Sequence, residues 1–126
     1  MTILLTCGDP NGIGLEVCIK ALMRLFEPSA PKRFDAEVRL IAAPDTFWEY
    51  VRNLQLPLER TASGFVLYGR EYRIIPCASK HHLEFGVENR SGGSLALEAL
   101  EIAARELREG RADAVCTMPV SKHALY

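Results

Sequence analysis

The sequence predicts an α/β fold, a mainly parallel sheet with flanking helices. Short apolar runs typical of buried strands, beginning with residues 1–6, alternate with segments whose apolar residues recur at helical spacing, such as residues 14–26. Strands that alternate with helices need crossover connections, and these join parallel strands. In such sheets ligands bind beyond the carboxyl ends of the strands, which directs attention to residues 8–14 and 117–122.

The N-terminal half is predicted to contain strands, helices and one hairpin. The strands and helices are residues 1–6 (strand), 14–26 (helix), 37–43 (strand) and 46–54 (short helix). Residues 63–78 then hold two β-rich runs around Tyr68 and Gly69, the pattern of an antiparallel hairpin.

The C-terminal half predicts a long helix, a further strand and the start of another helix. The chain is irregular up to Ser94, from which an apolar stripe runs to Leu107, and Gly110 is a helix stop. Residues 112–119 form a buried strand and residues 120–126 begin a new helix. No repeat or boundary divides the chain, so residues 1–126 are expected to form one α/β portion without an internal boundary.

Composition and charge exclude several classes of partner. The 126 residues are 48% hydrophobic and 25% charged, as in an ordinary globular domain. The net charge of -1 lacks the basic excess that drives binding to nucleic acid or anionic membranes. No apolar run could span a membrane, and the first residues lack the features of a signal peptide. We therefore expect a cytoplasmic protein with no nucleic-acid or membrane partner.

The four cysteines, Cys7, Cys18, Cys77 and Cys116, contain no C-x-x-C pair. They are predicted to be small buried thiols in a reducing compartment. A disulfide or zinc site is the alternative.

Residues 8–14, GDPNGIG, form a glycine-rich turn between the first strand and the first helix. They match neither the dinucleotide fingerprint nor the P-loop, because the glycine spacing differs and no Lys-Ser or Lys-Thr follows. Free backbone N–H groups and a helix dipole suit an anionic group, and Asp9 and Asn11 could bind a ligand or cap the helix. A structural turn and a ligand loop both stay open here. The candidates are Gly8, Asp9, Asn11, Gly12 and Gly14.

The segment TMPVSK, residues 117–122, supplies a second set of candidates, Thr117, Pro119 and Lys122. A lysine at this place suits a phosphate or carboxylate as a point charge, although a single lysine is more often solvated surface.

The three histidines are not assigned as metal ligands. His81 and His82 are adjacent and would point apart, and no carboxylate gives them or His123 a metal-binding spacing. Ser91 and Ser94 flank two glycines at a predicted helix start, where a capping role and a phosphate-facing role both stay open.

Three stretches, TCGDPNGIGLE, FGVENRSGGSLALEALEIA and GRADAVCTMPVSKHAL, resemble in order and spacing the N-terminal part of the 4-hydroxythreonine-4-phosphate dehydrogenase family of vitamin B6 biosynthesis. The positions that match the family pattern are Gly8, Asp9, Pro10, Gly12, Ile13, Gly14, Glu16, Gly93, Ser94, Asp113, Ala114, Thr117, Pro119 and Lys122. The chain departs from the pattern at Asn11, Leu15 and Met118, where the family has alanine, proline and a small residue. These departures leave the substrate open, because related dehydrogenases act on other four-carbon acid phosphates.

The resemblance implies a fold of the isocitrate and isopropylmalate dehydrogenase type, in a homodimer, of which this chain covers the opening third. It implies that the whole enzyme oxidises and decarboxylates 4-phosphohydroxy-L-threonine on the way to pyridoxal 5'-phosphate. The cofactors would be NAD and a divalent metal, either zinc, magnesium or cobalt.

The family's metal-binding histidines and nicotinamide site lie beyond Tyr126, so we assign no metal ligand and no catalytic residue in this chain. It is expected to bind no cofactor and to be inactive alone. Within the resemblance, residues 8–14 and 117–122 line one side of the cleft, near a small phosphorylated substrate.

Other hypotheses about the function of this chain stay open. The chain could be a shortened, non-catalytic relative that binds small phosphorylated anions, or a generic α/β domain whose motifs coincide by chance. If it is a fragment, the apolar face with Leu95, Leu100 and Leu107 would be left exposed, which predicts self-association or a homodimer.

Overall fold

The computed structural model describes residues 1–27, 29 and 35–125. The elements in chain order are β1 (Thr2–Thr6), α1 (Gly14–Leu25), β2 (Glu37–Ala42), α2 (Pro44–Asn53), β3 (Glu59–Arg60), β4 (Gly64–Leu67), β5 (Arg70–Pro76), α3 (Arg90–Arg108), β6 (Ala114–Cys116) and α4 (Lys122–Leu125). No helix in these ranges is both long enough and apolar enough to cross a membrane.

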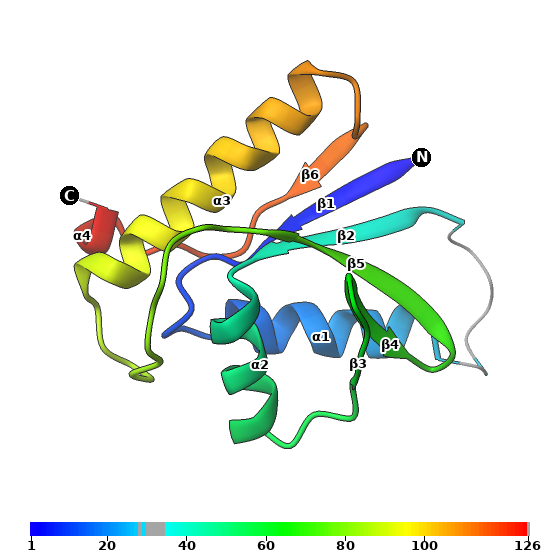
Figure 1. The fold of residues 1–126 in the computed structure, drawn as a ribbon, viewed down its shortest axis with the longest axis horizontal. Coiled ribbons are helices and arrows are strands. Elements are labelled where there is room, and N and C mark those ends of the chain that lie inside the picture. Colours follow the sequence, from blue (N-terminus) through cyan, green and yellow to red (C-terminus); the bar gives the residue numbers. More distant parts are fainter. Residues whose placement is uncertain (28, 30–34, 126) are drawn as a thin grey trace.

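The six strands form one sheet in the order β3-β4-β5-β2-β1-β6. The four strands β5, β2, β1 and β6 are parallel to one another, whereas β4 runs antiparallel to both of its neighbours, β3 and β5. Figure 1 shows α1 and α2 on one side of the sheet and α3 on the other. The predicted α/β class, a mainly parallel sheet with flanking helices, is confirmed.

The predicted hairpin is the connection between β4 and β5. Leu67 pairs with Arg70, so only Tyr68 and Gly69 lie in the turn. Both have positive φ, 52° and 73°, as a type I′ turn requires. The hairpin adds an antiparallel edge to the otherwise parallel sheet.

Stacked aromatic side chains attach this hairpin to α2. The ring of Phe65 on β4 lies 5.4 Å from that of Phe47 on α2 and 5.0 Å from that of Tyr72 on β5, measured between centroids. All three side chains are buried. Gly64 is required beside them, because a Cβ there would lie 1.8 Å from the carbonyl oxygen of Tyr72.

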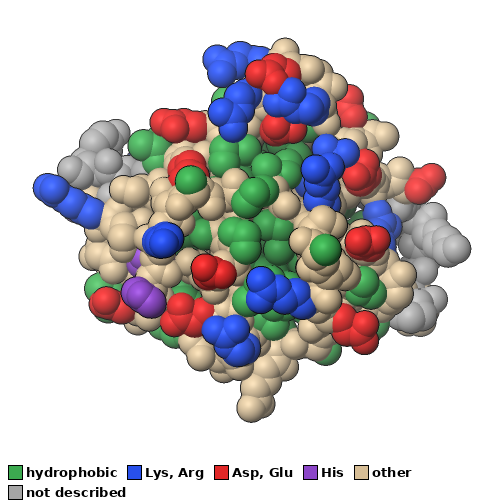
Figure 2. Space-filling view, viewed as in Figure 1, with side chains coloured by type: hydrophobic (Ala, Val, Ile, Leu, Met, Phe, Trp, Pro, Cys, Tyr) green, Lys and Arg blue, Asp and Glu red, His purple; other side chains and the backbone are tan. Residues whose placement is uncertain are grey.

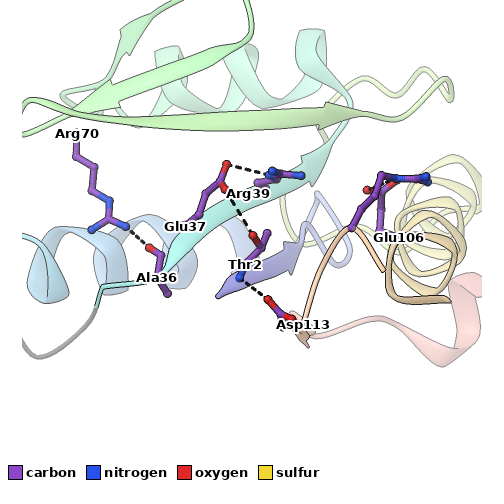
Figure 3. A network of polar contacts seen from close by, with 8 residues as sticks. Thr2, Ala36, Glu37, Arg39, Arg70, Glu106 and Asp113 are labelled. Carbon is purple, nitrogen blue, oxygen red and sulfur yellow. Dashed lines mark hydrogen bonds and ion pairs between the residues drawn. The ribbon is translucent and has the colours of Figure 1, made fainter. Parts of the chain in front are cut away.

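Polar contacts join the strands at their amino ends (Figure 3). The backbone N–H of Thr2 donates to Asp113 Oδ2 over 2.8 Å, which ties β1 to the start of β6. Arg39 Nε donates to Glu37 Oε1 over 3.1 Å, and this hydrogen bond holds the pKa of Glu37 below its ordinary value. These side chains are therefore engaged in contacts within the protein at the amino ends of the strands.

The long helix α3 begins at Arg90, so the prediction that it starts at Ser94 was wrong. Asn89 caps the helix, with its Oδ1 accepting the N–H of Gly92 over 2.9 Å. The first turn contains no large apolar residue, so apolar periodicity alone could not reveal it. Leu95 is buried in the core at 1% exposure, which corrects the expectation that it would be exposed.

Three of the four cysteines are buried, as predicted, but Cys116 on β6 is exposed. It lies on a strand that pairs with β1 alone, at the end of the sheet, so its side chain is less covered. Burial raises the pKa of Cys18 and of Cys77 to about 12, so these thiols stay protonated at neutral pH.

Figure 2 shows apolar side chains in the middle of one face of the molecule, with charged side chains around them. Val17 on α1 is 47% exposed, and the neighbouring Ile13 is 65% exposed. Scattered apolar side chains of this kind are common on proteins that remain monomeric. Self-association therefore stays a prediction.

Candidate functional site

The glycine loop, residues 8–14, packs directly against the segment that follows β6. The N–H of Asp9 donates to the carbonyl of Pro119 over 3.0 Å. Gly8 has a φ of 66°, and a Cβ there would lie 2.4 Å from the same carbonyl oxygen and 2.9 Å from Met118 Cβ. Only glycine allows the two segments to approach this closely. The structure thus brings together the two candidate segments that the sequence indicated.

Asn11 attaches the glycine loop to the segment before α3. Its Oδ1 accepts the N–H of Glu84 over 2.8 Å, and its Nδ2 donates to the carbonyl of Val87 over 2.8 Å. The N–H of Gly86 donates to the carbonyl of Asn11 itself over 2.9 Å. Asn11 is 3% exposed, and its amide oxygen and amide nitrogen both have partners within the protein.

His81 extends this connection to the start of α3. Its Nε2 lies 2.7 Å from Asn11 Oδ1, and its Nδ1 lies 2.6 Å from Ser91 Oγ. The orientation of the Asn11 amide is fixed by its two backbone partners, so Nε2 carries a proton and donates to Oδ1. Nδ1 of the neutral ring is then an acceptor, and the single proton of the Ser91 hydroxyl can go either to Nδ1 or to Asn89 Oδ1, which lies 3.1 Å from Ser91 Oγ. Three segments distant in sequence therefore meet at one imidazole.

Burial lowers the pKa of His81 below its ordinary value, although the carboxylates of Asp9, Glu49 and Glu84 oppose the shift. The neutral form is therefore favoured at neutral pH. This role of His81 could not be predicted from the sequence, because no spacing rule relates a histidine to partners 10 and 70 residues away.

Asp9 shapes the loop and does not cap α1. Its Oδ1 accepts the N–H of Asn11 over 3.0 Å, a local turn, and its backbone carbonyl accepts the N–H of Gly12 over 3.0 Å. The N-cap residue of α1 is Ile13, and no side chain caps that helix. Of the roles that the sequence left open for Asp9, helix capping is wrong.

The loop, the Asn11-bound segment and the residues after β6 surround an open cavity of about 340 Å³. The residues that line it are Asp9, Asn11, Gly12, Ile13, Gly86, Val87, Glu88, Pro119, Val120 and Ser121. The cavity lies at the carboxyl ends of β1 and β6, where ligands bind in parallel α/β sheets. Among the residues that the structure describes, the lining includes two carboxylates, those of Asp9 and Glu88, and no Lys or Arg.

The remaining candidates lie at or near this cavity. Gly8 and Gly14 are buried against Met118, beneath the cavity wall. Thr117 and Lys122 are exposed and are not part of the lining. Lys122 is the first residue of α4 and directly follows Ser121, a lining residue.

In the part of the chain that the structure describes, no group of three or more His, Cys, Asp or Glu side chains is arranged to hold a metal ion. Both ring nitrogens of His81 already have partners within the protein. These residues do not fit a metal centre, and we derive no chemical step through one.

Comparison with known proteins identifies the family. A family model described as the pyridoxal phosphate biosynthetic protein PdxA matches residues 21–126. The chain belongs to this family. The resemblance of the three sequence stretches to the 4-hydroxythreonine-4-phosphate dehydrogenases is thereby confirmed.

Curated relatives extend the match to the glycine loop. A D-threonate 4-phosphate dehydrogenase from Cupriavidus necator is 28% identical over 97% of this chain and 37% of its own length. A 4-hydroxythreonine-4-phosphate dehydrogenase from Bacteroides thetaiotaomicron is 27% identical over 96% of this chain and 33% of its own length. The chain thus spans about a third of the length of these relatives.

Solved PdxA structures share the fold. The 4-hydroxythreonine-4-phosphate dehydrogenase of Klebsiella pneumoniae superposes with a TM-score of 0.74 at 25% identity, covering 98% of this chain and 38% of that protein. The enzyme of the same name from Burkholderia phymatum gives a TM-score of 0.77 at 23% identity, with the same coverage. The expected fold, the first part of the isocitrate dehydrogenase type, is confirmed.

Proposed function

We propose that this chain forms one wall of the substrate cleft of a dehydrogenase that oxidises a four-carbon acid phosphate. The observation that carries the proposal is the convergence of the glycine loop, residues 86–88 and residues 119–121 around one cavity at the carboxyl edge of the sheet. All three segments lie within the stretches that resemble the dehydrogenase family, and Asn11 attaches residues 86–88 to the glycine loop.

The charge of this wall bears on the substrate. Asp9 and Glu88 line the cavity, and the described part of the chain contributes no Lys or Arg to the lining, so the wall repels a phosphate and attracts a cation. 4-Phosphohydroxy-L-threonine carries an ammonium group at the carbon where D-threonate 4-phosphate carries a hydroxyl. We propose that the ammonium group faces Asp9 and Glu88, which favours 4-phosphohydroxy-L-threonine.

Lys122 has a different role in this proposal. It follows Ser121 at the rim and is exposed, so its ammonium group can reach outward to the phosphate end of the substrate. The two ends of the substrate would then be held by opposite charges.

The finer features of the family function belong to the same proposal. The protein would act in pyridoxal 5'-phosphate biosynthesis, as a cytoplasmic homodimer, with NAD and a divalent metal held by residues outside this chain. The family membership and the dehydrogenase names of its relatives support this. A dehydrogenase acting on D-threonate 4-phosphate is the second candidate, because a relative of that name is 28% identical.

The test is a kinetic comparison with the protein encoded by the full source reading frame. Reduction of NAD is followed with 4-phosphohydroxy-L-threonine and with D-threonate 4-phosphate, for the unmodified protein and for Asp9→Asn, Lys122→Ala and Glu101→Gln. The last variant is the control, because Glu101 is exposed on α3 and does not line the cavity.

Asp9→Asn is expected to reduce kcat/KM for the ammonium-bearing substrate about tenfold or more, with a smaller loss for the hydroxy acid. Lys122→Ala is expected to lower kcat/KM for both substrates alike, and Glu101→Gln is expected to change it for neither. Equal losses for both substrates in Asp9→Asn would refute the assigned contact. If the protein oxidises neither substrate but binds one of them, the non-catalytic module replaces the dehydrogenase.

A further inference from the structure

A second cavity, of about 450 Å³, lies between the start of α2 and the loop that joins β3 to β4. Pro76, which ends β5, and Pro44, which begins α2, form part of its lining. It therefore also opens near the carboxyl edge of the sheet. It shares no lining residue with the cavity beside the glycine loop.

The charge of this cavity is opposite to that of the first. Arg60 and Arg73 belong to its lining, to which the described ranges of the chain contribute no acidic residue. The ion pairs that the structure describes include none with Arg60. Its guanidinium carbon lies 5.3 Å from the ring centroid of Trp48, which holds the charge at the cavity wall.

An unsatisfied hydroxyl lies in the same wall. Thr61 lines the cavity, and its Oγ1 is buried without a hydrogen-bond partner among the described residues. Buried polar side-chain atoms nearly always have a partner, and a bound molecule is one reason for an exception. The neighbouring Ser63 adds a second hydroxyl to the lining.

The apolar part of the cavity is the indole of Trp48 together with Pro44 and Pro76. Trp48 is 7% exposed, so its position is fixed by packing. The cavity thus places a free guanidinium and an unpaired hydroxyl next to a rigid apolar surface, the usual composition of a small-ligand site.

We propose that this cavity binds a small organic anion, with a phosphate or carboxylate group at Arg60 and Thr61 and an apolar body against Trp48. The guanidinium donates paired hydrogen bonds to the oxyanion, and the Thr61 hydroxyl donates a further one. The proposal is independent of the dehydrogenase function, because it uses none of the residues assigned to the substrate wall.

Trp48 is the only tryptophan of the chain, so its fluorescence reports directly on this cavity. The experiment titrates the protein with phenyl phosphate, benzoate and inorganic phosphate while Trp48 emission is recorded. The variants are Arg60→Gln, Thr61→Val and, as control, Arg52→Gln, an exposed arginine on α2 that does not line the cavity.

A saturable change of Trp48 emission is expected with phenyl phosphate or benzoate, at lower concentration than with inorganic phosphate. Arg60→Gln is expected to weaken binding about tenfold or more, and Thr61→Val to weaken it less, with Arg52→Gln unchanged. Saturation only by inorganic phosphate would refute the apolar contact. The absence of saturation through the millimolar range, or an equal loss in Arg52→Gln, would overturn the proposal.

Discussion

Replacing Asn11 by alanine is predicted to destabilise the protein, although alanine is the residue that the family pattern has at this position. Substitutions toward a family consensus commonly stabilise proteins. Here the Asn11 side chain is 3% exposed and bonds to His81 and to the backbone of Glu84 and Val87. Alanine removes these three hydrogen bonds together.

The loss of stability can be estimated from the burial of each hydrogen-bond partner of Asn11. His81 is 7% exposed, so its Nε2–H would lose its acceptor inside the protein, at a cost of about 1–3 kcal/mol. Glu84 and Val87 are exposed, and water can replace their bonds, at about 0.5–1.5 kcal/mol each. The sum, about 2–6 kcal/mol, is a large part of the 5–15 kcal/mol by which a typical domain is stable.

The assay is urea unfolding at neutral pH, followed by circular dichroism and by Trp48 fluorescence. Asn53→Ala is the matched control, because Asn53 is exposed at the end of α2 and is expected to change stability by less than about 0.5 kcal/mol. If Asn11→Ala were as stable as the unmodified protein, or more stable, the role assigned to the Asn11 side chain would be refuted.

Two further predictions concern the same loop. Burial lowers the pKa of His81 in the folded protein, so protonating the ring destabilises the fold. The stability is therefore fully present at pH values above the pKa of His81 in the unfolded chain, near 6.5. It is lost as the pH falls toward the lower pKa of His81 in the folded protein. Urea unfolding across this range should show that loss in the unmodified protein and in His82→Gln but not in His81→Gln; a pH dependence retained by His81→Gln would contradict it. Gly8→Ala should cost at least about 2 kcal/mol, because the new Cβ would lie 2.4 Å from the Pro119 carbonyl oxygen and φ is 66°. Gly12→Ala is the control, with its Cβ at 3.4 Å from the nearest atom, and equal stability of the two variants in thermal unfolding would be evidence against the close approach.

Much of the fold could be predicted from the sequence, because local signals agreed with the tertiary structure. The strand at residues 1–6, the helix from residue 14 and the Tyr68–Gly69 hairpin all follow from apolar periodicity or turn chemistry. The start of α3 could not be found in this way, since its first turn is specified by the Asn89 cap. The two-residue β3 exists only through its pairing with β4.

The candidate site also has features that could be predicted from the sequence and features that could not. The meeting of residues 8–14 with residues 117–121 could be predicted, because it follows from strand ends in a parallel sheet. The third segment could not, because Asn11 reaches it through hydrogen bonds to His81, Glu84 and Val87, which lie 70 to 76 residues away in the sequence. The negative charge of the cavity could not be predicted either, because it depends on which loop residues line the cavity.

The most direct test of the proposed substrate wall is a titration of the isotope-labelled chain with 4-phosphohydroxy-L-threonine, followed by NMR of the backbone amides. The account predicts that the largest shifts fall in residues 8–14, 86–88 and 119–121, which surround the cavity beside the glycine loop. Shifts confined to the residues around Trp48 and Arg60, or no shifts at all, would contradict it.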